Sequence, residues 1–180
     1  NVKEYKQEEL RNKIGYISQK ATLFTGNIRS NIAYGENGKA DPSDEEIDEA
    51  LNIAQAEEFI KSLEDGKDAY VAQNGSNFSG GQKQRLSIAR AIARKPEILI
   101  FDDSFSALDY RTDKVLRKTL DEKCKDITRI IVAQRIGTIR DADKIIVLED
   151  GKIAGMGRHE DLMRDCDVYQ KIAIPQFVME

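Results

Sequence analysis

Two short stretches of this sequence carry residue types that handle phosphate and divalent metal ions. In the first, a Ser-Gly-Gly turn at residues 79–81 opens a basic helix. Such a turn presents backbone N–H groups and the positive end of the helix dipole, which suits an anion such as phosphate. In the second, an apolar strand at residues 98–101 ends in Asp102 and Asp103, and carboxylates there can hold Mg²⁺ beside a phosphate. Together the two stretches indicate nucleotide chemistry.

The Ser79 turn also has a purely structural interpretation. Ser79 and Gln82 have the spacing of a capping box, which would make the serine an ordinary helix N-cap. Two adjacent glycines cost helix stability, roughly 1 kcal/mol each relative to alanine, so a simple cap would not need both. Close approach of a ligand to the backbone explains Gly80 and Gly81 better.

Acidic residues often end buried strands, so the residue types alone say little. The position of the two carboxylates is more informative. In α/β sheets, ligands bind at the carboxyl edge of parallel strands, which is where Asp102 and Asp103 lie. We expect Asp102 to reach Mg²⁺ through water. Asp103 is expected where a general base or a water-orienting residue is needed.

Composition places the chain among ordinary globular proteins. Its 180 residues can bury one sizeable core or two small subdomains, and 40% of them are apolar and 33% charged. The net charge of −4 predicts no nucleic-acid partner. No apolar run approaches the ~20 residues that span a bilayer, and no leader pattern opens the chain. Cys124 and Cys166 lack metal-ligand spacing, and we expect both to be reduced thiols.

The hydrophobic pattern predicts an α/β sheet interrupted by a mostly helical insert. Strands are expected at residues 14–18, 98–101 and 130–133, the second buried on both faces, with a hairpin of residues 144–148 and 152–156 across Asp150-Gly151. Helical segments are expected around residues 27–33, 43–54, 59–63, 79–95, 112–124 and 160–164. The predicted division is a partial α/β core at residues 1–19, a helical subdomain at residues 20–95 and an α/β core at residues 96–180.

The order and spacing of these motifs resemble the nucleotide-binding domain of ATP-binding cassette (ABC) transporters. The motifs that carry the resemblance are Gln19, Phe78-Ser79-Gly80-Gly81-Gln82, the strand ending in Asp102-Asp103, Ser106-Ala107-Leu108-Asp109, and Gln134. Residues 22–35 resemble the segment after the Q-loop in exporters. The resemblance covers essentially the whole chain. It implies a P-loop NTPase (RecA-like) core with an inserted α-helical subdomain.

The resemblance also implies roles for individual residues. Gln19 matches the Q-loop glutamine, which senses Mg²⁺ and the γ-phosphate, and Asp102 matches the Walker B aspartate. Ser79, Gly80, Gly81 and Gln82 match the signature loop, which binds ATP held by the opposite subunit of a head-to-tail dimer. Ser106, Ala107, Leu108 and Asp109 match the D-loop at the dimer interface. The implied cofactors are ATP and Mg²⁺. The implied partners are a second nucleotide-binding domain and an exporter's transmembrane domain, at the cytoplasmic face of a membrane.

The first departure from the family pattern is that residues 1–180 contain no Walker A motif. The nearest candidate, Gly35-Glu36-Asn37-Gly38-Lys39-Ala40, ends in alanine rather than serine or threonine. The motif requires a glycine at position 33, where this sequence has alanine, and no strand precedes the segment. We expect the chain to be an N-terminally truncated fragment without its phosphate cradle, and to be inactive alone.

The second and third departures affect the residues of catalysis. The family's catalytic glutamate position is Asp103, one methylene shorter, and a misplacement of ~1 Å can cost about 100-fold in rate. The switch-histidine position is Gln134, which can hydrogen-bond a phosphate but gains no charge near neutral pH. The one histidine, His159, matches a helix start, and we interpret it as structural.

Both changes resemble the degenerate half of a heterodimeric exporter. The sequence therefore predicts a domain with a weakened site of its own and an intact signature loop that acts in trans. Two alternatives stay open. One is a non-transport ABC ATPase acting on DNA or ribosomes, although such proteins usually carry a long insert between Q-loop and signature. The other is a non-catalytic module whose nucleotide-dependent dimerisation is regulatory.

Overall fold

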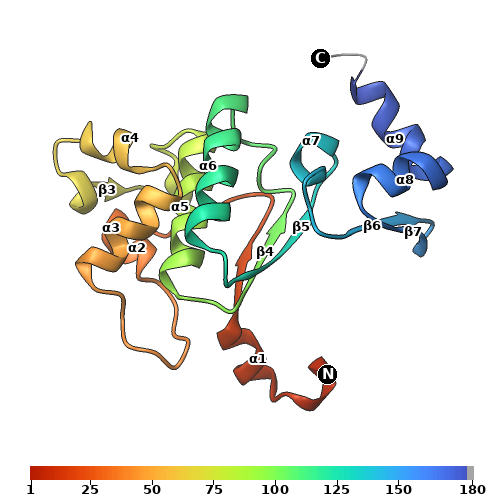
Figure 1. Cartoon of the computed structure of the whole chain (residues 1–180). Helices are drawn as coiled ribbons and strands as arrows, with labels where there is room; N and C mark the ends of the chain where they lie inside the picture. The colour runs from red at the N-terminus through yellow and green to blue at the C-terminus, as the bar shows by residue number, and fades with distance from the viewer. Residues whose placement is uncertain (178–180) are drawn as a thin grey trace. The chain divides into compact units, whose positions relative to one another are not determined.

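The computed structural model describes residues 1–177, and its internal contacts divide the chain into two compact units. Unit 1 runs from Asn1 to Val132, and unit 2 begins at Ala133. Figure 1 shows the course of the chain through both units. The division into residues 1–19, 20–95 and 96–180 is not tested by these two units and stays a prediction.

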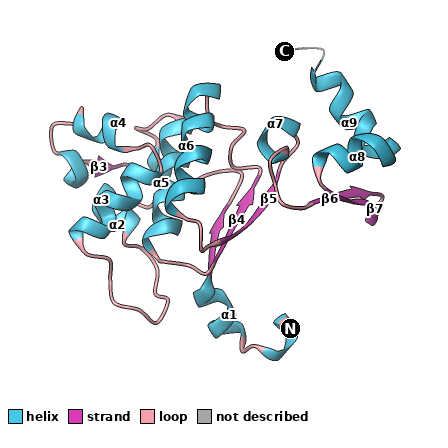
Figure 2. Cartoon of the chain, viewed as in Figure 1, coloured by secondary structure: helices cyan, strands magenta, loops and turns pink. Residues whose placement is uncertain are grey.

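Unit 1 is built on a three-stranded parallel sheet in the order β1-β4-β5 (Figure 2). Strand β1 spans Ile14–Ile17, β4 spans Ile98–Asp102 and β5 spans Thr128–Val132. Helix α6 (Tyr110–Lys123) connects β4 to β5, so the predicted βαβ unit is confirmed. In the register of these strands, Asp102 lies opposite Val132.

Helix α5 (Gly80–Ala93) packs closely against β1 at Gly15. A Cβ atom at this glycine would come within 3.1 Å of the Ala91 carbonyl oxygen and 2.8 Å of Leu99 Cδ2. Any larger residue would push the helix away from the sheet. The glycine therefore fixes the distance between α5 and the strands that end at the candidate site.

The prediction that residues 98–101 are buried on both faces of the sheet is confirmed in full for one face only. Leu99 and Phe101 are fully buried, whereas Ile98 and Ile100 are only partly so. Helices α2 (Ile28–Ile32) to α6 gather on one side of the strands (Figure 2). On the other face the row through Ile100 continues to Tyr16 and Ile130, which are about half exposed. Burial in β4 therefore alternates with the period of two of a strand that is covered on one side.

The segment between β1 and β4 is mostly helical, as the sequence predicts. It contains β2 (Gly26–Asn27), α2 (Ile28–Ile32), α3 (Asp44–Ile53), α4 (Glu57–Lys61), β3 (Tyr70–Val71) and α5. The chain also forms α1 (Gln7–Lys13) and the 3₁₀ turns Val2–Glu4, Gly66–Asp68 and Gln73–Gly75. The capping box that opens α3 is confirmed: Ser43 N–H donates to the Glu46 carboxylate (2.9 Å) and Glu46 N–H donates to Ser43 Oγ (3.3 Å).

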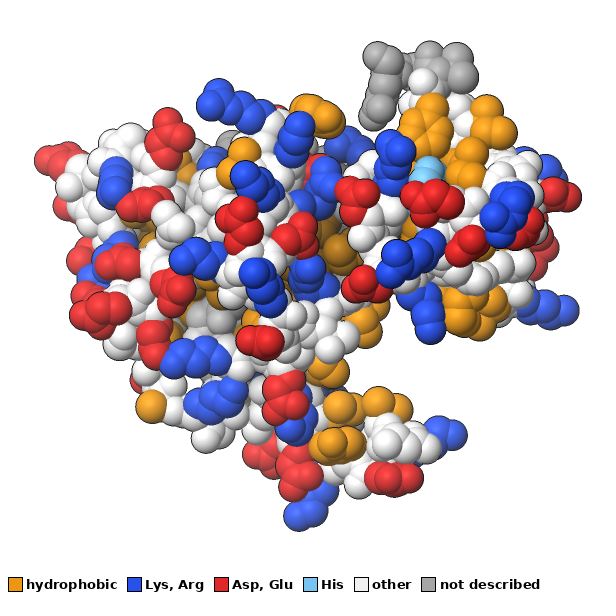
Figure 3. All heavy atoms as spheres, viewed as in Figure 1, with side chains coloured by type: hydrophobic (Ala, Val, Ile, Leu, Met, Phe, Trp, Pro, Cys, Tyr) orange, Lys and Arg blue, Asp and Glu red, His pale blue; other side chains and the backbone are white. Residues whose placement is uncertain are grey.

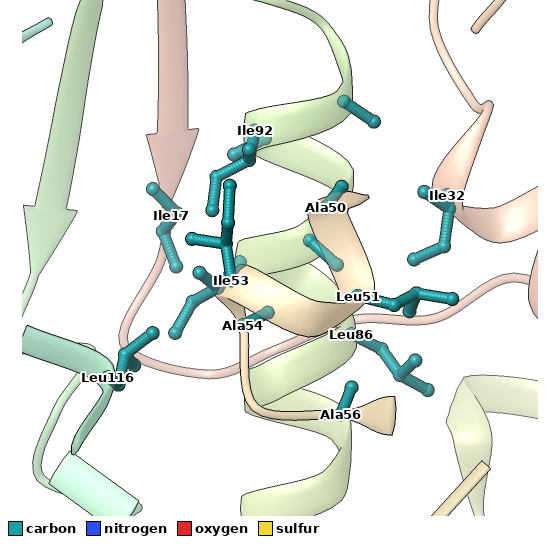
Figure 4. Packing of buried hydrophobic residues seen from close by; sticks show 14 of the residues in the cluster. Ile17, Ile32, Ala50, Leu51, Ile53, Ala54, Ala56, Leu86, Ile92 and Leu116 are labelled. Carbon is teal, nitrogen blue, oxygen red and sulfur yellow. The ribbon is translucent and has the colours of Figure 1, made fainter. Parts of the chain in front are cut away.

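One hydrophobic core joins this helical segment to the sheet of unit 1. Figure 4 shows side chains from β1, α3, α5 and α6 meeting in that cluster, among them Ile17, Ile53, Leu86 and Leu116. The inward positions predicted on α3 and α6, such as Leu51 and Leu120, are buried. Figure 3 shows acidic and basic side chains interspersed over the helices of unit 1 rather than gathered into one basic field.

Unit 2 contains a hairpin covered by helices. The unit comprises α7 (Ile136–Ile139), β6 (Ile145–Glu149), β7 (Lys152–Gly157), α8 (His159–Asp165) and α9 (Asp167–Phe177). The predicted hairpin is confirmed, and Asp150 (φ 49°) and Gly151 (φ 74°) both adopt the left-handed conformation that a two-residue turn requires. His159 is buried, and its Nδ1 lies 2.9 Å from the hydroxyl of Tyr169 on α9. This contact supports a structural interpretation of the histidine.

Among residues 1–177, no helix is long and apolar enough to cross a membrane.

Candidate functional site

The ends of β1 and β4 bring three of the predicted site residues together. The Gln19 side-chain amide donates to Asp103 Oδ2 (3.0 Å), so the glutamine lies against the second carboxylate. The Tyr16 hydroxyl donates to Asp102 Oδ2 (2.7 Å). The carboxylate raises the pKa of Tyr16 because the hydrogen bond favours the protonated phenol, and desolvation acts in the same direction.

The backbone of Asp103 turns sharply as it leaves β4. Its φ of 46° lies in the left-handed region, which aspartate and asparagine tolerate better than most residues. Its N–H donates to the Val132 carbonyl (2.9 Å), and its own carbonyl accepts from the Ser106 hydroxyl (2.7 Å). The position of the Asp103 carboxyl group is therefore set by bonds on both sides of the residue.

A buried serine fastens the two strand ends to each other. Ser104 is fully buried, and its hydroxyl donates to the Ile17 carbonyl at the end of β1 (2.8 Å). A buried hydroxyl is costly unless it is hydrogen-bonded, so this pairing holds the turn after β4 against β1. It fixes the spacing between Gln19 and the carboxylates.

The segment of residues 106–109, which matches the D-loop, leads from this turn into α6. Ser106 and Ala107 are exposed and Leu108 is buried. Asp109 is the N-cap of α6, where it accepts from the Thr112 N–H (2.9 Å). Hydrogen bonds from the Thr112 backbone and hydroxyl lower the pKa of Asp109 because they favour the carboxylate.

The signature segment has a regular helix start. The capping box is confirmed: Ser79 N–H donates to Gln82 Oε1 (2.9 Å), and Gln82 N–H donates to Ser79 Oγ (3.2 Å). A Cβ atom at Gly80 would meet no atom of the described chain within 4 Å, and one at Gly81 would meet only the Ala107 carbonyl, at 3.4 Å. Neither glycine has a positive φ. Among residues 1–177, backbone conformation and packing therefore do not demand two glycines here.

The glycine-containing loop at residues 35–40 has a structural role. Asn37 donates from its side-chain amide to the Arg94 carbonyl (2.8 Å), and the Lys39 ammonium donates to the Lys95 carbonyl (2.7 Å). Both bonds satisfy carbonyls at the C-terminal end of α5, where a cation also complements the helix dipole. The loop thus uses the Asn37 and Lys39 side chains to cap the end of α5.

Gln134 belongs to unit 2, whereas Gln19, Asp102 and Asp103 belong to unit 1. Its backbone carbonyl accepts from the Gln176 side-chain amide of α9 (3.0 Å), and the same side chain accepts from Ile136 N–H (2.9 Å). The segment that contains Gln134 is therefore held in place by α9.

Two polar side chains of unit 1 add contacts that the sequence interpretation missed. Tyr16 could have been found, because alternation along β1 and β4 places it on the same sheet face as Ile100 and Asp102. Gln84 is buried on α5, and its amide donates to the Ser18 carbonyl (3.1 Å). Helical periodicity places it inside but gives no hint of a partner 66 residues away.

The strand-end cluster offers oxygen ligands of the kind that Mg²⁺ prefers, from Asp102, Asp103 and Gln19. Among residues 1–177, no group of three or more His, Cys, Asp or Glu side chains could hold a metal ion. A sparse set of this kind suits Mg²⁺, which keeps several waters and shares phosphate oxygens, better than a metal that is held wholly by protein. The residues present therefore fit Mg²⁺ bound together with a nucleotide.

Comparisons with known proteins place the chain in a family. Residues 1–106 match the family described as ABC transporter. An uncharacterized ABC transporter ATP-binding protein of Mycobacterium bovis is 44% identical over 176 residues, covering 98% of this chain and 30% of the relative. An ATP-dependent lipid A-core flippase of Pectobacterium atrosepticum is 41% identical over 177 residues, with the same coverages. This chain belongs to the ABC transporter family.

The fold agrees with that assignment. A bacterial Atm1-family ABC exporter with ATP bound superposes with a TM-score of 0.87 at 38% identity, over 93% of this chain and 29% of the exporter. The predicted α/β class, of the P-loop NTPase type with a parallel sheet, is confirmed. The chain spans about a third of the length of these relatives, which include exporters.

Proposed function

We propose that this chain is part of the nucleotide-binding domain of an ATP-driven exporter and couples ATP binding and hydrolysis to transport across a membrane. The observation that carries the proposal is the pairing of Gln19 with Asp103 beside Asp102, in a chain whose relatives include exporters. Its partners would be the exporter's transmembrane domain and a second nucleotide-binding domain. The assembly would place the chain at the cytoplasmic face of the membrane.

The signature segment would act on a nucleotide held by the partner domain. Ser79 and Gly80 are exposed, and the open space at Gly80 lets a phosphate approach the backbone N–H groups of the helix start. Gly81 lies beside the Ala107 carbonyl, so the signature segment and the segment matching the D-loop are neighbours. This arrangement supports a shared surface that faces the partner domain.

The strand ends would form the chain's own, weakened site. Asp102 would hold Mg²⁺ through water, Gln19 would orient toward the metal and the phosphate, and bound Mg²⁺ would neutralise phosphate charge. The Asp103 carboxylate accepts a bond from Gln19 and is one methylene shorter than a glutamate, so it is poorly placed to receive a proton from water. Gln134, in unit 2, cannot carry positive charge to the phosphate. These features support a degenerate site in a heterodimeric exporter.

The test is ATP turnover by the chain alone and with a partner nucleotide-binding domain whose Walker A motif and catalytic glutamate are intact. We expect essentially no turnover by the chain alone, and ATP-dependent association and turnover with the partner. A partner with its catalytic glutamate replaced by glutamine is the control and should associate without turnover. Turnover by the chain alone, or no ATP-dependent association with the intact partner, would contradict the proposal.

A second function is favoured by the Gln19–Asp103 bond, which occupies the carboxylate that hydrolysis at this chain's own site would use. In this alternative the chain is a non-catalytic module whose nucleotide-dependent dimerisation is regulatory. The same experiment separates the two functions. ATP-dependent association with an intact partner, without any turnover, would favour the regulatory module over the ATPase.

A further inference from the structure

Gln84 is a polar side chain that the proposed function leaves without a role. It lies on α5, two residues beyond the signature segment, and is 1% exposed among apolar residues of the core of unit 1. Burying an amide is unfavourable unless its hydrogen bonds are made, and an apolar side chain would fill this position without that cost. The contact that Gln84 makes is therefore the feature to explain.

The partner of Gln84 is the peptide group that precedes Gln19. Gln84 Nε2 donates to the Ser18 carbonyl (3.1 Å), which belongs to the planar peptide unit joining Ser18 to Gln19. The preceding carbonyl, that of Ile17, accepts from the buried Ser104 hydroxyl (2.8 Å). Two consecutive carbonyls are thus held by side chains from two different elements, α5 and the turn after β4. Beyond them, the Gln19 amide reaches Asp103 (3.0 Å).

We infer that Gln84 is a positioning residue that couples the signature segment to Gln19, and this inference rests on the proposed function. Helix α5 begins at Gly80 and is continuous through Gln84, so a shift of the Ser18–Gln19 peptide is transmitted to the exposed helix start. The signature segment serves the partner's nucleotide, and Gln19 serves the chain's own. The Gln84 bond therefore links the two nucleotide sites of the dimer through one chain.

The test replaces Gln84 with methionine in the assembled transporter that contains this chain. Methionine has similar length but no donor, so it removes the bond and fills the space. The matched control is Leu86→Met, which repacks a fully buried position on the same helix without touching Ser18. Hydrogen–deuterium exchange of residues 18–22 reports on the Gln19 segment, and steady-state ATPase kinetics report on the competent site.

With Gln84→Met we expect faster exchange at residues 18–22, and a fall in kcat of about fivefold, the size of one neutral hydrogen bond, with an unchanged KM for MgATP. Leu86→Met should leave exchange and kcat near wild type. If Gln84→Met does not fold, Gln84→Asn, shorter by one methylene, should raise the same exchange and lower kcat. Unchanged exchange at residues 18–22, or an equal fall in kcat for Gln84→Met and Leu86→Met, overturns the inference. Absence of ATPase activity in the wild-type assembly would instead contradict the proposed function, while the exchange measurement would still test the bond.

Discussion

The signature segment and the strand-end cluster both carry residues suited to phosphate, yet the two are built in opposite ways. At the signature segment, polar side chains satisfy only the helix cap, and the backbone at Gly80 faces open space. At the strand ends, the side chains are paired with one another, Gln19 with Asp103 and Tyr16 with Asp102. In the first region the backbone is open, whereas in the second each carboxylate already accepts one hydrogen bond through its Oδ2 atom.

This contrast accounts for the assignment of two roles within one chain. A preformed surface of backbone donors stabilises developing charge without reorganisation, which suits a competent site. The Asp103 carboxylate, which accepts a hydrogen bond from Gln19 on a backbone turn with φ 46°, is held in one position.

The largest effect is expected for Ser79→Arg in the assembled transporter. The arginine would fill the space in front of Gly80 and remove the cap, so we expect ATPase activity to fall by about 100-fold or more, as for loss of a preorganised donor. Ser76→Arg, an exposed change three residues upstream, adds the same charge and should retain activity. Equal losses in the two variants would contradict a specific role for the signature segment.

A gain of activity is expected when the weakened site is restored. In the Ser79→Arg background, Asp103→Glu with Gln134→His supplies a longer base and a side chain that can gain a proton. We expect ATPase activity to recover by about 10-fold, within the range that positioned acid–base groups contribute. Each single change should recover less than the pair. No recovery in the pair would show that these two positions do not limit the site.

A smaller effect is expected for Tyr16→Phe, which frees the Asp102 carboxylate from its hydrogen bond. We expect the Mg²⁺ concentration needed for half-maximal nucleotide binding to fall by about threefold, somewhat less than one full hydrogen bond would give. Tyr70→Phe, at a more exposed tyrosine of unit 1, is the control. An unchanged Mg²⁺ requirement in Tyr16→Phe would mean that Asp102 does not serve the metal.

The capping boxes at Ser43 and Ser79 allow the effect of a lost N-cap on stability to be separated from its effect on ATPase activity. Ser43→Ala and Ser79→Ala each remove an N-cap, and each should lower the free energy of unfolding by about 1 kcal/mol in denaturant titrations. Only Ser79→Ala should also lower ATPase activity, because α3 has no site at its start. Equal ATPase activity in the two variants would mean that Ser79 acts only as a helix N-cap.

Local chemistry could be predicted from the sequence, but partners distant in the chain could not. The capping boxes at Ser43 and Ser79 and the turn at Asp150-Gly151 depend on neighbouring residues, and all three are confirmed. The partial burial of one face of β4 could not be predicted, because an apolar run does not reveal how much of each face is covered. Helix α9 was not predicted from the sequence, because Pro175 near its end interrupts the usual helical pattern.

The same holds for the candidate site, whose residues could be named from the sequence although their distant contacts could not. The sequence motifs name Gln19, Asp102 and Asp103, and the structure brings them together at the ends of β1 and β4. The bond from Gln84 to Ser18 depends on how α5 packs over β1, which no local pattern contains. The roles of the site residues remain predictions.

The most direct test of the account compares Asp103→Ala with Ser79→Arg in the same assembled transporter. Steady-state ATPase activity of the two variants, measured at saturating MgATP, reports which region serves the competent site. The account predicts that Asp103→Ala retains most of the wild-type activity, whereas Ser79→Arg loses most of it. A greater loss in Asp103→Ala than in Ser79→Arg would contradict it.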